Sequence, residues 1–216
     1  MRFPVILSIA LSTLLVGCGA TLPTAPPLQA YRDDSAQPST YRTFPRGRDT
    51  YVALVLTQNT IRHFDYTAEI LSEIDSKYSY GSHVAPILDA RREVIDPSLM
   101  SSWVITSLRQ YFGTIAVFED IASAKATNAD VFAVLDWYFV LNEMPGDKTS
   151  ARVSLHFYDS GFRKIGQATG SSSSANHSIG PVDTAEIADI IRRDKRIPLT
   201  ALMKMDQGIS QLANKR

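Results

Sequence analysis

The segment that most constrains the fold is Val131–Leu141, an apolar run in which Asp136 is the only charged residue. β-branched and aromatic side chains occur throughout this run, and such side chains are enriched in strands. A run of this composition is typical of a strand that lies inside a sheet. We therefore expect Val131–Leu141 to be the central strand of the domain, with Phe139 buried in the core.

Four other segments are predicted to be strands, namely Tyr51–Leu56, Ile115–Phe118, 153–157 and the stretch from Ile165 into Ser171–Ser174. The first is a continuous apolar run, which suits a strand covered on both faces. In the third, apolar residues alternate with Arg152, Ser154 and His156, as in a half-exposed antiparallel strand. Turns are predicted at Pro145–Asp147, before the third strand, and at Asp159–Gly161, before the fourth.

Helices are predicted at Phe64–Tyr78, Asp96–Phe112 and Ile121–Thr127, and others begin at Asp183 and at Pro198. The second helix has the clearest ends, because Asp96 can cap its first turn and Gly113 can stop it. Its apolar face includes Trp103, which we expect to be buried. Ser79–Val94 shows no assignable pattern. The order of elements predicts an α/β (α+β) fold, in which a mixed sheet of about five strands has helices packed on it.

The N-terminus has the parts of a secretory leader. Arg2 precedes an apolar stretch that ends in Leu15–Cys18, and Cys18 is the only cysteine of the chain. A charged start, a short apolar core and small residues before the cleavage point describe such a leader, and cleavage just before a cysteine is typical of bacterial lipoproteins. A membrane-spanning helix would need roughly 20 apolar residues, more than this stretch holds. We predict a signal peptide at residues 1–17 and lipidation at Cys18.

The residues after Cys18 predict the location of the protein and a tether. Gly19 follows the cysteine, and no aspartate follows it to suggest retention in an inner membrane. If the source has two membranes, we expect a lipid anchor in the outer membrane and a domain in the periplasm. Residues 18–49 contain many Pro, Ala, Ser and Thr residues without apolar periodicity, which predicts a disordered tether. One domain is expected at 50–216.

The charge balance and the motifs argue against several functions. The chain has 22 basic and 22 acidic residues and no polybasic cluster, so nucleic acid is a poor partner. The sequence has no Gly-rich phosphate loop, paired-His helix motif, Cys pair or Gly-x-Ser-x-Gly elbow, and no cofactor is expected. Its histidines are His63, His83, His156 and His177. They are far apart in the sequence and in different predicted elements, so no metal site is predicted.

Two features could carry chemistry, namely Asp136 and the serine tract Ser171–Ser174. A buried, unpaired carboxylate is costly, so Asp136 must find a partner or face a cleft. An acid in a pocket is one interpretation, but we favour pairing with Arg109 or Arg152, or exposure near the end of the strand. The serine tract could supply a nucleophile, yet no base stands at a readable spacing. We favour a small-residue strand that lets a helix or another subunit approach closely, and we predict no catalytic residue.

The layout resembles that of a known group of lipoproteins. After the lipobox and the tether come the strand Tyr51–Leu56, the Trp103 helix, Ala129–Val131 leading into the long apolar strand, and a hairpin after Lys148–Ser150. This order is similar to the small α/β domain of outer-membrane lipoproteins related to the curli-secretion lipoprotein and to the penicillin-binding-protein activator lipoprotein. The similarity spans most of the mature chain but includes no diagnostic residue motif. It implies a non-catalytic envelope component that binds a protein or a polysaccharide, or that self-associates.

We therefore expect a lipid-anchored, non-catalytic interaction or assembly component of the cell envelope, and two alternatives stay open. A periplasmic hydrolase would need a pocket that joins Asp136 or Ser171 to a histidine such as His156. A lipid-anchored small-molecule binder would need a large apolar cavity. Hydrogen-bond reach between His156 and Ser171 would favour the enzyme, whereas a solid core with an exposed apolar edge would favour the interaction protein.

Overall fold

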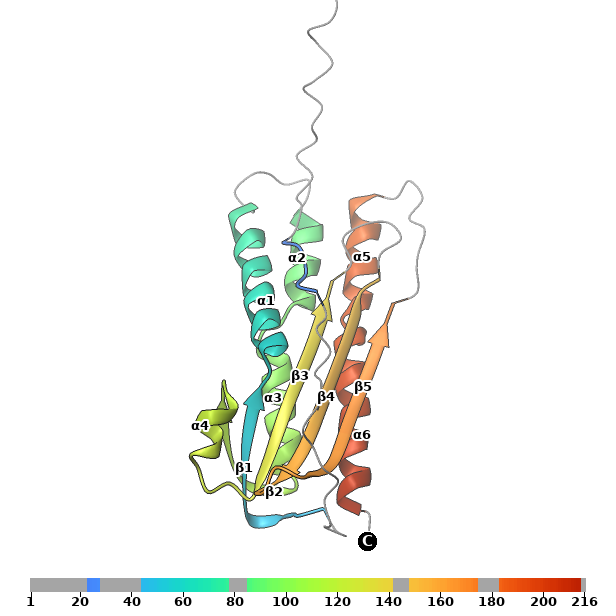
Figure 1. The fold of residues 1–216 in the computed structure, drawn as a ribbon. Coiled ribbons are helices and arrows are strands. Elements are labelled where there is room, and N and C mark those ends of the chain that lie inside the picture. The colour runs from blue at the N-terminus through green and yellow to red at the C-terminus, as the bar shows by residue number, and fades with distance from the viewer. Residues whose placement is uncertain (1–22, 28–43, 78–84, 142–147, 175–182, 215–216) are drawn as a thin grey trace, which may run out of the picture.

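A five-stranded mixed sheet forms the centre of the structure (Figure 1). The computed structural model describes residues 23–27, 44–77, 85–141, 148–174 and 183–214. The strands are β1 (Gly47–Leu56), β2 (Phe112–Phe118), β3 (Val131–Val140), β4 (Ser150–Asp159) and β5 (Lys164–Ser173). Their order in the sheet is β2-β1-β3-β4-β5, where β1 is parallel to β2 and β3, and β4 is antiparallel to both its neighbours. The predicted fold class and the central position of β3 are confirmed.

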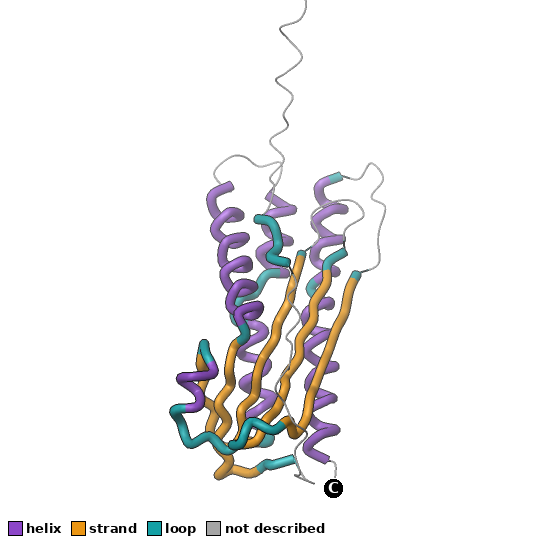
Figure 2. The backbone as a smooth tube through the Cα atoms, viewed as in Figure 1, coloured by secondary structure: helices purple, strands orange, loops and turns teal. Residues whose placement is uncertain are grey.

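Most of the helices pack on one face of this sheet. The helices are α1 (Gln58–Lys77), α2 (Ala85–Val94), α3 (Leu99–Arg109), α4 (Ile121–Lys125), α5 (Thr184–Asp194) and α6 (Arg196–Asn214). All except α4 contribute side chains to the main core. Figure 2 shows α4 standing apart from the others, beside β1. The helix α4 packs through Ala124 with Val55, Phe132 and Tyr158 in a smaller apolar cluster. Both faces of β1 and β3 are therefore covered, which explains their continuous apolar sequences.

Several helices differ in their bounds from the sequence prediction. The helix α1 begins at Gln58 rather than Phe64, and α2 occupies part of the segment without an assignable pattern. The helix α3 ends at Arg109, so Phe112 and Gly113 belong to β2. A Cβ atom at Gly113 would lie 1.5 Å from the carbonyl oxygen of Arg48. This glycine therefore allows the start of β1 to approach β2 closely, and it does not stop a helix.

The N-terminal cap of α5 agrees with the sequence prediction, whereas the cap of α3 differs from it. The carboxylate of Asp183 accepts a hydrogen bond from the backbone N–H of Glu186 at 2.8 Å, as predicted for the start of α5. At α3 the N-cap is Ser98, and Asp96 instead accepts bonds from the backbone N–H and the hydroxyl of Ser98. Asp96 therefore stabilises the turn before the helix and does not cap it.

The ordered core begins before residue 50. Phe44 is buried, and its ring packs edge-on against Phe157 with a centroid distance of 5.0 Å. The strand β1 then starts at Gly47, whereas the sequence prediction starts the strand at Tyr51.

The predicted turn Pro145–Asp147 lies outside the described residues. None of the described helices combines the length and the apolar character needed to cross a membrane.

Candidate functional site

The strand β3 extends past the end of β1, and side chains from the start of α1 satisfy its backbone there. The last residue of β1, Leu56, is opposite Leu135. Beyond this point, the Thr60 hydroxyl donates to the Leu135 carbonyl at 2.9 Å and accepts from the Trp137 N–H at 2.9 Å. The Asn59 side-chain amide donates to the Trp137 carbonyl at 3.0 Å. These side chains replace the missing strand for the Leu135 carbonyl and for the backbone N–H and carbonyl of Trp137.

Asp136 belongs to the same arrangement. Its Oδ1 accepts hydrogen bonds from the Thr57 hydroxyl at 2.9 Å and from the Asn59 amide at 3.1 Å. The residue is only 2% exposed. The predicted pairing with Arg109 or Arg152 is wrong, because both arginines are exposed and the structure shows no ion pair between Asp136 and either of them. Neutral donors at the β1–α1 junction satisfy this carboxylate instead.

His63 completes this group, one turn after Asn59 on α1. Its Nδ1 lies 2.7 Å from the Asn59 carbonyl oxygen, and a carbonyl can only accept, so Nδ1 carries the proton. The ring is fully buried and contacts Tyr138 edge-on. Burial lowers the pKa of His63 more than the Asn59 bond and the Asp136 charge raise it. The imidazole is therefore neutral at neutral pH.

We name Thr57, Asn59, Thr60, His63 and Asp136 the β1–α1 clamp. The clamp lies at the carboxyl end of β1. The connection from β1 to β2 runs over one face of the sheet, and the connection from β2 to β3 runs over the opposite face. Ligands commonly bind at such points in α/β sheets. However, the polar groups of the clamp are directed mainly at one another and at β3. Neither His63 nor Asp136 lines the hollows that described residues form beside Trp137, Trp103, Arg152 and Arg193. The clamp therefore fastens α1 to the sheet.

The structure separates His156 from Ser171, the pair whose contact would favour a hydrolase. His156 pairs with Gln167 across β4 and β5, whereas Ser171 pairs with Arg152, four residues farther along β4. They are too far apart for a hydrogen bond, because a strand rises about 3.3 Å per residue. His156 has its Nδ1 3.4 Å from the Lys164 ammonium. Arg152 is exposed as expected, whereas Ser154 and His156 are buried, so this face of β4 is exposed only near the start of the strand.

The other candidate residues from the sequence either serve in packing or lie outside the described residues. The segment of small residues in β5 lets α6 approach closely, as predicted, because a Cβ atom at Gly170 would lie 1.9 Å from the Ala201 carbonyl oxygen. Cys18, His83 and His177 lie outside the described residues. Among the residues that are described, no group of three or more His, Cys, Asp or Glu side chains could hold a metal ion.

Trp103 is the residue whose setting differs most from the prediction. It is half-buried on α3 and lines a hollow of about 410 Å³ between α3 and α6. Its helix packs into the core through Val104 and Leu108, both fully buried, so Trp103 lies at the margin of the apolar face. The expectation that Trp103 is a buried core residue is therefore wrong, while Phe139 is buried as predicted.

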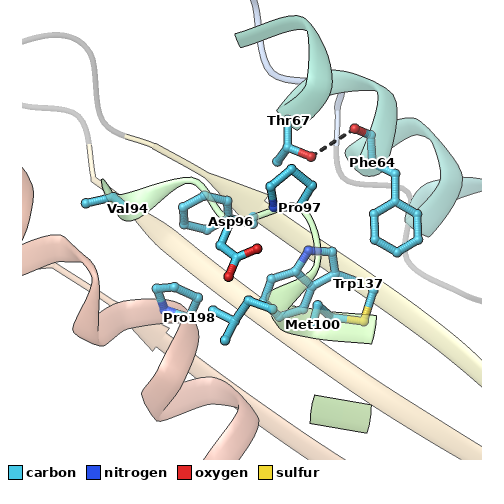
Figure 3. Close-up of a pocket in the computed structure, with 10 residues that line it drawn as sticks. Phe64, Thr67, Val94, Asp96, Pro97, Met100, Trp137 and Pro198 are labelled. Carbon is cyan, nitrogen blue, oxygen red and sulfur yellow. Dashed lines mark hydrogen bonds between the residues drawn. The ribbon is translucent and has the colours of Figure 1, made fainter. Parts of the chain in front are cut away.

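The apolar cavity nearest the sheet is small. It has a volume of about 20 Å³, and Figure 3 shows Trp137, Met100 and Pro198 around it, with the Asp96 carboxylate nearby. The Thr67 hydroxyl, which also lines it, donates to the Phe64 carbonyl at 2.8 Å. This space holds about one water molecule. It is far too small for the small-molecule ligand that an apolar binding protein would enclose.

Comparisons with known proteins give only distant similarities. No protein-family model matches the chain, and no curated protein matches it in sequence. Its fold is similar to that of the PelC dodecamer from Paraburkholderia phytofirmans, with 10% identity over 81% of this chain and 94% of that chain and a TM-score of 0.36. For a DUF330 protein from Xanthomonas campestris the identity is 13% over 82% of this chain and 94% of that chain, with a TM-score of 0.31.

A third solved structure is also similar to this chain. It is a neuraminyllactose-binding hemagglutinin homolog from Helicobacter pylori, with 13% identity over 74% of this chain and 86% of that chain and a TM-score of 0.28. The identities and TM-scores of all three neighbours are low. The functional argument below therefore rests on the residues of this chain.

Proposed function

We propose that this chain is a lipid-anchored, non-catalytic protein of the cell envelope that acts as an interaction or assembly component. The observation that carries the proposal is the exposed apolar edge of the sheet at β2. Val117 in β2 is 48% exposed, and Ile121, at the start of α4, is 38% exposed. The strand β2 is the outermost strand on its side. No strand of the described residues pairs with the outer edge of β2, which therefore offers backbone groups and an apolar side chain to a strand of a partner protein.

The uses of the polar residues also favour binding over catalysis. Asp136 and His63 stabilise the junction of β1 and α1, and His156 and Ser171 are too far apart to act as base and nucleophile. A hydrolase that used Ser171 as nucleophile would need a base within hydrogen-bond reach of it. The solid core beside an exposed apolar edge is the combination expected of an interaction protein.

A photo-crosslinking experiment in intact cells tests this proposal. A photoreactive amino acid is placed at Val117 and, as a control, at Ala68, an exposed apolar residue of α1. We expect a discrete crosslinked species from Val117, either with an envelope protein or with a second copy of the chain, and none from Ala68. Abundant, anchored protein without any crosslink from Val117 would overturn the proposal.

The lipid anchor is a separate part of the proposal and rests on the sequence Leu15–Cys18. Acylation needs the sulfur of Cys18, so Cys18→Ser should abolish labelling by a fatty-acid probe and leave the protein as uncleaved precursor or in soluble form. Because a single acyl chain gives only marginal membrane binding, we expect several acyl groups on the wild-type protein, measurable by mass spectrometry. Continued labelling of the Cys18→Ser protein would contradict the anchor.

A further inference from the structure

The hollow between α3 and α6 combines an aromatic side chain with acidic groups. Its lining residues are Asp96, Ser98, Leu99, Ser102, Trp103, Thr106, Ser107, Gln110 and Asp206. Two of these described lining residues are acidic and none is basic. The hollow is therefore negatively charged at neutral pH, although the chain as a whole is balanced. Its charge is complementary to that of a cationic group.

Asp206 is the residue that points most directly to a missing partner. It is half-buried on α6, and its Oδ1 is buried without a hydrogen-bond donor among the described residues. A buried carboxylate oxygen without a donor is costly, because it has lost water and gained nothing in return. Elsewhere in the protein, the buried Asp136 receives donors from two side chains. Among the buried side-chain atoms of the described residues that lack a hydrogen-bond partner, Asp206 Oδ1 is the only carboxylate oxygen.

Two more features of the hollow favour a positive charge. Trp103 is half-buried on the same hollow, and a Trp ring attracts a cation placed over its face. Thr106, Ser107 and Gln110 line it from the C-terminal end of α3, where the helix dipole is negative. Arg109, in the same turn, is not among the lining residues. The site therefore offers a ring, a carboxylate and a negative helix end to one occupant.

We propose that this hollow binds an arginine side chain of a protein partner, which stacks on Trp103 and donates hydrogen bonds to Asp206. Arginine fits better than lysine because its planar guanidinium stacks on aromatic rings and donates to a carboxylate through two parallel N–H groups. The inference rests on the proposed interaction role and names the chemistry of the partner at a second surface, away from the β2 edge.

Titration with small peptides tests this inference on the purified full-length chain in non-ionic detergent. The probe is a capped glycine–arginine–glycine tripeptide, compared with the lysine and glutamate versions. Binding is followed by NMR at the two indole N–H groups, since the chain has only Trp103 and Trp137. Trp137 is buried, so it serves as an internal control. We expect a saturable shift of the Trp103 signal with arginine, a weaker effect with lysine and none with glutamate.

Matched variants identify the groups responsible. Asp206→Asn should weaken arginine binding at least about fivefold, as expected for loss of a charge-assisted hydrogen bond. Asp65→Asn makes the same charge change at an exposed position of α1 and should leave binding unchanged. Trp103→Leu keeps an apolar side chain and should weaken binding several-fold. Wild-type affinity in the Asp206→Asn protein, or equal binding of lysine and arginine, would overturn the inference.

The peptide titration and the crosslinking experiment test the inference and the proposed function independently. A partner captured at Val117, together with a hollow that ignores the arginine peptide, overturns only the inference. Arginine binding in a protein that captures nothing at Val117 overturns only the role assigned to the β2 edge.

Discussion

The two outer edges of the sheet are treated differently. At the β5 edge, the Lys204 ammonium donates to the Ser171 carbonyl at 2.8 Å, and α6 lies directly against the strand at Gly170. At the β2 edge, the structure shows Val117 exposed, with no comparable side-chain bond to the strand among the described residues. Charged side chains and covering elements are how proteins protect a sheet edge from unwanted pairing. The β5 edge is therefore closed by α6, whereas the β2 edge is the one that we propose for a partner.

The β1–α1 clamp closes a third edge, which lies inside the sheet where β3 extends beyond the end of β1. Where β1 ends, Asn59 and Thr60 take over the hydrogen bonds that a neighbouring strand would make to β3. Their partners are backbone groups in the centre of the sheet. The closed edges depend on these contacts, so we expect substitutions there to lower the free energy of unfolding. Substitutions at the β2 edge should instead weaken the binding of a partner.

The largest effect is expected from Gly170→Val. A Cβ atom here would collide with the Ala201 carbonyl and lie 2.8 Å from the Met205 backbone nitrogen, and a backbone cannot move aside as a side chain can. We expect a loss of about 3 kcal/mol or more in the free energy of unfolding, measured by urea denaturation. Thr169→Val, on the exposed neighbouring position, is the control and should change stability by less than about 0.5 kcal/mol. Similar stabilities of the two variants would mean that α6 does not press on β5.

A smaller loss is expected from Thr60→Val. Valine has nearly the shape of threonine but leaves the Trp137 N–H without its acceptor and takes a donor from the Leu135 carbonyl. Because these groups are buried, the free energy of unfolding should fall by about 2 kcal/mol. Thr106→Val makes the same change on the exposed side of α3 and should be nearly neutral. A Thr60→Val protein as stable as the wild type would show that the clamp is not needed to close β3.

The clamp should also make stability depend on pH. The pKa of His63 is lowered in the folded state, chiefly by burial, so below about pH 6.5 the unfolded chain binds a proton that the folded chain does not. Wild-type stability should therefore fall as the pH is lowered through this range. His63→Asn removes the titrating group, and the difference between its unfolding curves and those of the wild type isolates this contribution. Parallel pH profiles of the two proteins would argue against a neutral, buried His63.

The smallest effect on stability is expected at the open edge. Val117→Lys places a charge on an exposed residue and should change the free energy of unfolding by no more than about 0.5 kcal/mol. It should nevertheless abolish pairing at β2, because lysine is a common protection of edge strands. Normal thermal unfolding of this variant, together with loss of crosslinking from a probe at Thr114 in the same strand, would support the contrast between the two edges. A large loss of stability would show that the β2 edge is already covered.

The strands were predictable because their signal is local. Tyr51–Leu56 and Val131–Leu141 are apolar without interruption, and burial on both faces of the sheet requires this. The end of α3 was not predictable in the same way. Phe112 continues the helical spacing from Leu108, yet it packs in the core as the first residue of β2. Gly113 is typical of a helix stop, but its physical role is to admit the Arg48 backbone.

The clamp and the hollow could not be predicted because their residues meet across the fold. Asp136 binds Thr57 and Asn59, more than 70 residues earlier in the chain, and no spacing rule connects them. Similarly, Trp103 and Asp206 lie on helices that are adjacent only after the sheet has formed. Helical periodicity identified the apolar face of α3, but it could not show that Trp103 lies at the margin of that face.

The position of α6 has a consequence for when the protein can fold. This helix supplies Leu202, Met205 and Ile209 to the core and covers the inner face of β4 and β5. During synthesis, which adds about 5–20 residues per second, every strand is complete before this cover exists. The inner face of β4 and β5 therefore stays uncovered until α6 has been made. Completion of this fold is tied to the synthesis of α6, which follows every described strand in the sequence.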